Sequence, residues 1–197
     1  MHQKKTQLII HYSLGLAYAG SSRTEIADLL LPIVSDTSLS MELSSMAALS
    51  LGIAFVGSCD GDITSTILQT MMEREDQYLK ESWSRFMALG LGLLYLGKQD
   101  ASEATLETLK AIEHPLGKQA EVLVEALSYA GTGNVLKVQK MLHMCNDHLD
   151  KETEDDTFQG FATLGVALIA MGEEVGSEMS LRTFNHLVRR NMIKVTC

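Results

Sequence analysis

Proline and aromatic residues are scarce in this chain of 197 residues, which has two prolines and 6% aromatics. This scarcity argues against a β-sandwich or β-barrel, whereas eleven methionines and abundant leucine and alanine favour helices. Cysteine is scarce as well. Because Cys59, Cys145 and Cys197 are odd in number and widely spaced, no disulfide framework is expected, and a reducing compartment suits the chain best.

Positively charged residues are few: the chain has 16 lysines and arginines against 25 aspartates and glutamates, which gives a net charge of −9. A protein that follows a nucleic-acid backbone needs a basic stripe, so nucleic acid is not an expected partner, and neither is an anionic membrane surface. Long apolar runs are also missing, because none reaches the roughly 18 residues of a membrane-spanning helix. Length and composition predict one globular domain, although length alone permits two.

The stretch LGLAYAGSS at 14–22 follows two lysines and allows three interpretations: a signal peptide with an Ala-x-Ala cleavage site, a glycine-rich ligand loop, or one unit of a repeat. Related strings recur downstream, and their terminal glycines are 37, 40, 34 and 41 residues apart. A cleavage site has no reason to recur, whereas a structural unit does. The five terminal glycines are Gly20, Gly57, Gly97, Gly131 and Gly172.

Each repeat is predicted to contain two helices joined at its terminal glycine. The first, inner helix is apolar nearly all round and suits burial on most sides, and the glycine ends it in the left-handed conformation. The second, outer helix is amphipathic, with a capping box at Ser22-x-x-Glu25 and caps at Asp60 and Asp100. The inner helices are predicted at 6–19, 41–56, 82–96, 118–130 and 159–171, and the outer helices at 22–34, 61–75, 101–112, 133–148 and 174–189.

The sequence therefore predicts an all-α fold, an α-solenoid of about five helix-turn-helix repeats within one domain, 1–197. An irregular helical bundle would not place five glycines in register. The repeats are expected at about 6–38, 41–78, 82–115, 118–150 and 159–190. The string DHLDKETEDD has six acids and one lysine, and it predicts a mobile acidic loop at 147–158.

Five longer strings resemble a known family. The inner helices are similar to proteasome/cyclosome repeats, and the strings resemble the large non-ATPase subunits of the 26S proteasome base, over about 14–190. That family implies repeats that close into a toroid, of which five units would form an arc. The chain is expected to be a fragment, a truncated gene product or a truncated paralogue, since MHQKKTQLIIHY and NMIKVTC depart from the pattern. The strings are GLAYAGS, VGSCDGDITSTILQT, LGLGLLYLGK, SYAGTGNVLKVQ and ALIAMGEEVGSEMSLRTFNHL.

The outer helix at 61–75 is predicted to have one polar face. At 100° per residue, Gln69 and Glu73 lie within about 20° of Asp62, and Thr66 lies at about 40°. Taken alone, these residues indicate a solvated helix face. The resemblance implies a ubiquitin-binding surface here, in which Asp62 and Glu73 match acidic members. Gln69 and Ser38 replace acids of some relatives, which weakens attraction to the basic-rimmed apolar patch of ubiquitin.

The next outer helix carries three acids, Asp100, Glu103 and Glu107, within about 60° of one another. Lying beside the previous outer helix, they would extend the acidic surface, and solvation with helix capping is the alternative explanation. Asn134 is a further candidate at its border. The acidic loop is expected to have no binding role.

No pattern of residues indicates an enzyme, a cofactor or a metal. GTGN at 131–134 has neither the preceding strand nor the lysine of a phosphate-binding loop. His143 and His148 would point about 140° apart on one helix, so they would not share a tetrahedral ion. No constellation for nucleophilic catalysis is present, and the carboxylates are expected on outer faces rather than in a cleft.

The resemblance thus implies a non-catalytic receptor and scaffold segment of the proteasome regulatory particle, in the cytoplasm and nucleus. Its implied partners are ubiquitin, the ubiquitin-like domains of shuttle factors, and other base subunits including ATPases. Two alternatives stay open. One is a purely structural solenoid that contacts ATPase subunits, and the other is an inactive truncated paralogue.

Overall fold

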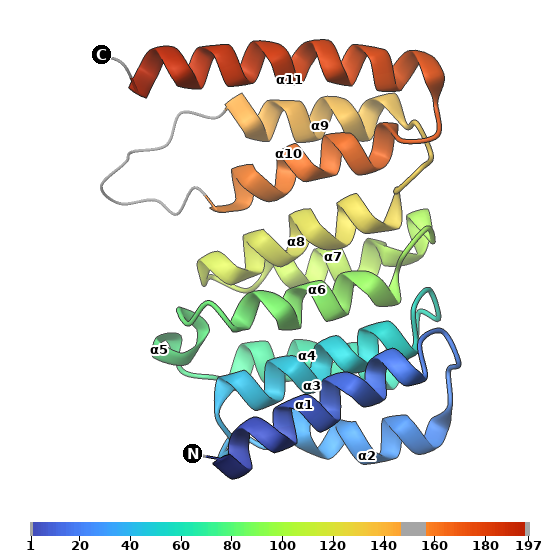
Figure 1. Ribbon diagram of the computed structural model, residues 1–197, viewed down its shortest axis with the longest axis vertical. Helices are drawn as coiled ribbons and strands as arrows, with labels where there is room; N and C mark the ends of the chain where they lie inside the picture. Colours follow the sequence, from blue (N-terminus) through green and yellow to red (C-terminus); the bar gives the residue numbers. More distant parts are fainter. Residues whose placement is uncertain (1, 147–156, 196–197) are drawn as a thin grey trace.

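The computed structural model describes residues 2–146 and 157–195, and every regular element in these ranges is helical. The prediction of an all-α fold is thereby confirmed (Figure 1). The elements are α1 (His2–Ala17), α2 (Thr24–Ser35), α3 (Met41–Ala54), α4 (Gly61–Glu73), α5 (Asp76–Leu79), α6 (Ser84–Leu94), the 3-10 helix η1 (Gln99–Ser102), α7 (Glu103–Lys110), α8 (Pro115–Ser128), α9 (Val135–Asn146), α10 (Thr157–Ala170) and α11 (Glu174–Val195).

The helices are stacked in two layers. The inner helices α1, α3, α6, α8 and α10 lie side by side in chain order, each packed on the next (Figure 1). The outer helices α2, α4, α7 and α9 form the second layer, and each packs on the inner helix of the following pair: α2 on α3, α4 on α6, α7 on α8 and α9 on α10. This offset binds successive pairs together.

The terminal glycines end the inner helices, as predicted. All five have positive φ values, from 66° at Gly57 to 95° at Gly172, in the region where a side chain would be strained. The glycine N–H then donates to a carbonyl of the following inner helix. These bonds join Gly20 to Ile53 (3.0 Å), Gly57 to Leu93 (2.9 Å), Gly97 to Leu127 (3.0 Å) and Gly131 to Leu168 (2.8 Å). We call this set of bonds the turn ladder.

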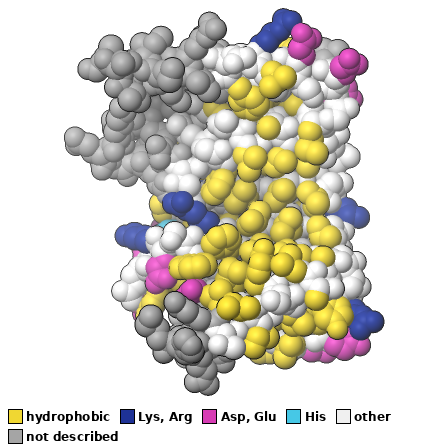
Figure 2. Space-filling model, in the orientation of Figure 1, with side chains coloured by type: hydrophobic (Ala, Val, Ile, Leu, Met, Phe, Trp, Pro, Cys, Tyr) yellow, Lys and Arg dark blue, Asp and Glu magenta, His cyan; other side chains and the backbone are white. Residues whose placement is uncertain are grey.

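Small residues let the inner helices approach closely. A Cβ atom added at Gly52 of α3 would lie 2.6 Å from the Cα of Gly90 on α6, well inside van der Waals contact. Two hydrophobic cores form between the layers, a larger one over α2–α8 and a smaller one over α8–α10. Figure 2 shows hydrophobic side chains gathered in a band along the inner-helix face.

Several local predictions are wrong. Ser22 and Glu25 form no capping box: Ser22 has a φ of 48° and donates its N–H to the Ala54 carbonyl, so α2 begins only at Thr24. Asp100 is not a helix cap either, because it lies within η1. The short helix α5 was not expected.

The acidic loop predicted at 147–158 lies mostly outside the described residues. Its last two residues, Thr157 and Phe158, belong to α10, so that part of the prediction is wrong. Among the helices that the structure describes, none combines the length and the apolar character needed to cross a membrane.

Candidate functional site

The site begins at the N-terminus of α4. The Asp60 carboxylate accepts hydrogen bonds from the N–H groups of Asp62 (3.1 Å) and Ile63 (3.0 Å), which confirms the predicted cap. The cap fixes the start of the helix and hence its rotation. One face, which includes Ile67 and Met71, is buried in the core.

The opposite face of α4 is rich in hydrogen-bond acceptors. Asp62, Gln69 and Glu73 are exposed, and Thr66 is half-buried. Thr66 donates its hydroxyl to the Asp62 carbonyl (2.8 Å), and the Gln69 amide donates to the Glu73 carboxylate (2.6 Å). Because these donors are engaged within the helix, carboxylate and amide oxygens dominate what the face presents to a partner.

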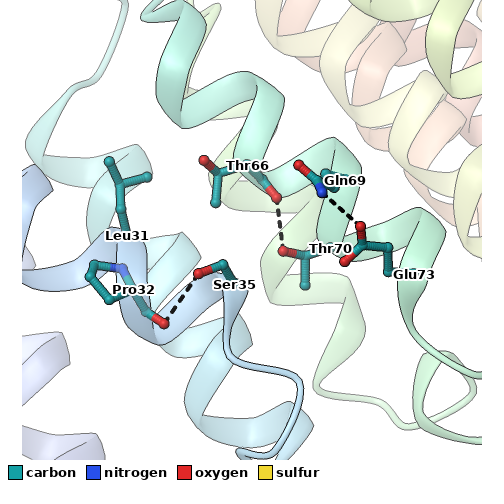
Figure 3. A pocket seen from close by; sticks show the side chains of 7 residues that line it. All are labelled: Leu31, Pro32, Ser35, Thr66, Gln69, Thr70 and Glu73. Atoms are coloured by element: carbon teal, nitrogen blue, oxygen red, sulfur yellow. Dashed lines mark hydrogen bonds between the residues drawn. The ribbon is translucent and has the colours of Figure 1, made fainter.

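A groove of about 380 Å³ separates this face from α2 (Figure 3). Leu31 and Pro32 form its apolar side, and Gln69 and Glu73 form its polar side. Thr70 donates to the Thr66 carbonyl (2.8 Å), and Ser35 donates to the Pro32 carbonyl (3.3 Å). The groove therefore combines apolar contact area with acceptors. Its lining residues are Leu31, Pro32, Ser35, Thr66, Gln69, Thr70 and Glu73.

Three of the seven residues predicted for the site, Thr66, Gln69 and Glu73, thus line one groove. Asp62 lies on the same helix, one turn before Thr66, and outside the groove lining. The wall that Leu31 and Pro32 form was not predicted from the sequence, because it depends on how α2 lies beside α4.

The acids of the next outer helix have different surroundings. Asp100 accepts a 2.5 Å hydrogen bond from the hydroxyl of Tyr129, the residue that follows α8, and this bond raises the pKa of Tyr129 to about 12. Glu107 forms an ion pair with Lys110 (2.6 Å), which raises the pKa of Lys110. Glu103 is exposed at the start of α7. Asp100 and Glu107 thus each bind a neighbouring side chain, whereas Glu103 presents an exposed carboxylate.

The two weaker candidates serve the local backbone. Ser38 donates its N–H (2.9 Å) and its hydroxyl (2.6 Å) to Asp36, which lowers the pKa of that carboxyl. The Asn134 side chain accepts from the N–H groups of Leu136 (3.1 Å) and Lys137 (3.2 Å) and so caps α9. Within the described part of the chain, no group of three potential metal ligands occurs.

Comparisons with known proteins bear on this architecture. A family model described as proteasome/cyclosome repeat matches residues 12–43. The 26S proteasome regulatory subunit rpn1 of Schizosaccharomyces pombe is 58% identical over 174 residues, 87% of this chain and 20% of the relative. The 26S proteasome non-ATPase regulatory subunit 2 of Dictyostelium discoideum is 48% identical over 190 residues, 96% of this chain and 21% of the relative.

The chain belongs to the 26S proteasome non-ATPase regulatory subunit 2 family. A further member of the subunit 2 family, homolog A of Arabidopsis thaliana, is 42% identical over 165 residues, 84% of this chain and 18% of the relative. The chain spans about one fifth of the length of these relatives. The family consists of non-catalytic, regulatory subunits, which confirms the prediction that the chain is not an enzyme.

Proposed function

We propose that the chain is a receptor and scaffold segment of the proteasome regulatory particle. It binds ubiquitin, or the ubiquitin-like domains of shuttle factors, at the groove between α2 and α4. The observation that carries this proposal is the pairing of an apolar wall, Leu31 and Pro32, with the acceptors of Gln69 and Glu73. Cytoplasm and nucleus are the compartments in which this function would be exercised.

The chemistry of the groove suits an apolar patch with a basic rim. Apolar side chains of the partner would cover Leu31 and Pro32, and lysine or arginine side chains would donate to the oxygens of Gln69 and Glu73. The exposed carboxylates of Asp62 and Glu103 extend the negative field along the outer layer. Their contribution is to the association rate and to partner choice more than to affinity.

The affinity of this single site is expected to be weak, in the micromolar range or poorer, because a groove of this size buries few side chains of a partner. Ubiquitin chains would gain affinity through a second site, at an effective concentration set by the linker between ubiquitin units. The proposed receptor therefore acts as one contact among several.

The test is a chemical-shift titration of isotope-labelled chain with ubiquitin. Glu73→Arg places a cation opposite the basic rim and is expected to weaken binding about tenfold or more. Glu178→Arg is the matched control, because it makes the same charge change on an exposed residue of α11. Equal affinity for the Glu73 variant and the unaltered chain would remove the groove from the proposal.

The hydrophobic band along the inner helices favours a second candidate function (Figure 2). As a structural solenoid, the chain would contact other proteasome base subunits, including ATPases, through this face, without a ubiquitin site. A pull-down that recovers base subunits, together with no shifts in the ubiquitin titration, would support this candidate. A chain that binds neither would correspond to an inactive truncated paralogue.

We also infer that the stacked pairs are an α-solenoid arc of a ring, and that they form one repeat domain, 1–197. The regular recurrence of the turn ladder supports this inference, because each interface repeats the previous one. The repeat bounds follow the terminal glycines, at about 6–38, 41–78, 82–115, 118–150 and 159–190.

A further inference from the structure

Pro32 lies inside a helix, a position that proline seldom occupies. The other proline of the chain, Pro115, is the first residue of α8, where a missing N–H group removes no helical hydrogen bond. Pro32 lies within α2, which continues beyond it to Ser35. An interior proline normally kinks or ends a helix, because it lacks the N–H group and its ring meets the carbonyl four residues earlier.

Contacts with neighbouring helices keep α2 intact through Pro32. Leu30 and Val34, on either side of Pro32, are fully buried in the larger core. The Val34 carbonyl also accepts a hydrogen bond from the Thr70 hydroxyl of α4 (3.3 Å). These contacts would be the same for any helical residue at position 32, and Pro32 itself is exposed. The packing of the fold therefore gives no reason for a proline here.

The missing N–H group leaves one carbonyl of α2 without its helical donor. In an α-helix, the N–H group of position 32 donates to the carbonyl of Asp28, and a proline cannot make this bond. Asp28 is exposed, like Pro32. At 100° per residue, Asp28 points between Pro32 and Ser35, which both line the groove (Figure 3). The open acceptor is therefore on the groove side of α2.

The same acceptor lies level with the acidic end of the groove. The hydrogen bond from Thr70 to Val34 sets the register of the two outer helices, so that a residue of α2 is level with the residue 36 positions later in α4. Asp28 is then level with the helical turn between Asp62 and Thr66. Two exposed carboxylates, those of Asp28 and Asp62, thus flank the groove beyond its lining residues.

We propose that Pro32 is a specificity-determining residue of the groove, because it keeps the Asp28 carbonyl open for a lysine or arginine side chain of the bound partner. This role presupposes the proposed function, since it acts within the same groove. The Asp28 carboxylate attracts the cation to the turn where the carbonyl accepts its N–H group. Glu73 on α4 receives a second cation, so the groove selects an apolar patch that has basic groups on both sides.

Pro32→Ala restores the N–H group and hence the helical bond to the Asp28 carbonyl. Its Tm is expected to rise by at least about 2 °C, because proline is the least favourable residue in a helix interior. Its affinity in the ubiquitin titration is expected to fall about three- to tenfold, since the partner loses one hydrogen bond. Damage to the fold would not raise stability and lower affinity together.

Pro32→Leu is the matched variant, because it restores the same N–H group and keeps an apolar side chain in the groove. It is expected to weaken binding as much as Pro32→Ala does. In the unaltered chain, the carbonyl ¹³C resonance of Asp28 should move downfield when ubiquitin is added, as a carbonyl carbon does when its oxygen accepts a hydrogen bond. In both variants, ubiquitin should leave this resonance unchanged.

Two results would overturn the role of Pro32. One is full affinity in Pro32→Leu, which would assign the effect of Pro32→Ala to lost apolar area. The other is an Asp28 carbonyl resonance that ubiquitin does not move in the unaltered chain. Glu73→Arg separates these results from failure of the proposed function: if it weakens binding and neither Pro32 variant does, the groove binds ubiquitin without the Asp28 carbonyl. If the unaltered chain does not bind ubiquitin, both proposals are wrong.

Discussion

Arg74 is a buried cation that joins the end of α4 to the segment between α2 and α3. Its Nη1 donates to the carbonyls of Thr37 (3.2 Å) and Leu39 (2.8 Å). Its Nη2 donates to the carbonyl of Asp36 (2.8 Å) and to the hydroxyl of Ser44 (2.7 Å). Burial lowers the pKa of Arg74, but the guanidinium keeps its charge because its ordinary pKa is so high. One side chain thus satisfies four acceptors.

Arg74→Met is expected to lower the free energy of unfolding by about 2–4 kcal/mol, because three partly buried carbonyls and the Ser44 hydroxyl lose their donor while the replacement fills a similar volume. Urea unfolding followed by circular dichroism measures the change. The control is Arg182→Met, which removes only an exposed ion pair with Glu178 (3.0 Å), worth about 0.5 kcal/mol at most. A comparable loss in both variants would contradict the role assigned to Arg74.

The role of Arg74 was not predictable from the sequence. Its partners are mostly backbone carbonyls, some 35 to 38 positions away along the chain. Because every residue has a backbone carbonyl, the residue type does not indicate which carbonyls Arg74 binds. The capping box at Ser22 failed for a related reason: its N–H bonds to Ala54 of another helix. A local capping motif is therefore not formed where a neighbouring helix pair supplies a hydrogen-bond partner for the same backbone group.

At the scale of the elements, the terminal glycines predicted the inner helices well, because a left-handed residue after an apolar helix is a strong signal. The polar face of α4 followed from helical periodicity. The groove did not, because α2 becomes its second wall only through the stacking of outer helices. The short helix α5 lies between two repeats, where the repeat pattern gives no guidance.

Alanine substitutions at two glycines separate the contribution of close helix packing to stability from that of helix propensity. Alanine at Gly52 would force α3 and α6 apart, because its Cβ would lie 2.6 Å from Gly90 Cα. The free energy of unfolding is expected to fall by about 1–3 kcal/mol. Alanine at Gly61, the first residue of α4, meets nothing within 4 Å. It is expected to stabilise by up to about 1 kcal/mol.

Thermal unfolding of these two variants gives opposite shifts in Tm if packing of the inner helices decides the outcome. A rise in Tm for Gly52→Ala would show that α3 and α6 yield to the added methyl group at little cost.

At the scale of the whole molecule, the two hydrophobic cores divide the stack unequally, and α8 contributes to both. Glu125 of α8 is almost fully buried and pairs with two lysines of α9, Lys137 (2.8 Å) and Lys140 (2.5 Å). Burial alone would raise the pKa of Glu125, but the hydrogen bonds from both lysines outweigh it, so the pKa lies below its usual value. This cluster ties α9 to the rest of the stack.

Glu125→Gln is expected to loosen the smaller core selectively. The free energy of unfolding is expected to fall by about 1–2 kcal/mol. The loss is moderate because both lysines are partly exposed and regain contact with water. Hydrogen exchange at neutral pH should quicken in α9 and α10 and stay unchanged in α3 and α4, since contacts in a stack reach only neighbouring helices. Equal quickening in all four helices would mean that the stack opens as one unit.

The pH dependence of the stability difference between the Glu125→Gln variant and the unaltered chain follows from the direction of the Glu125 pKa shift. Because the folded-state pKa of Glu125 is depressed, its carboxylate stabilises the fold above the unfolded-state pKa of about 4.3. That stabilisation disappears as the pH falls through the lower folded-state value, where the acid becomes neutral like glutamine. The difference in unfolding free energy between the two chains should therefore be full at pH 7 and shrink steadily below about pH 4. If the difference is the same at both pH values, the ion pairs are not its source, and the packing of Glu125 within α8 must be.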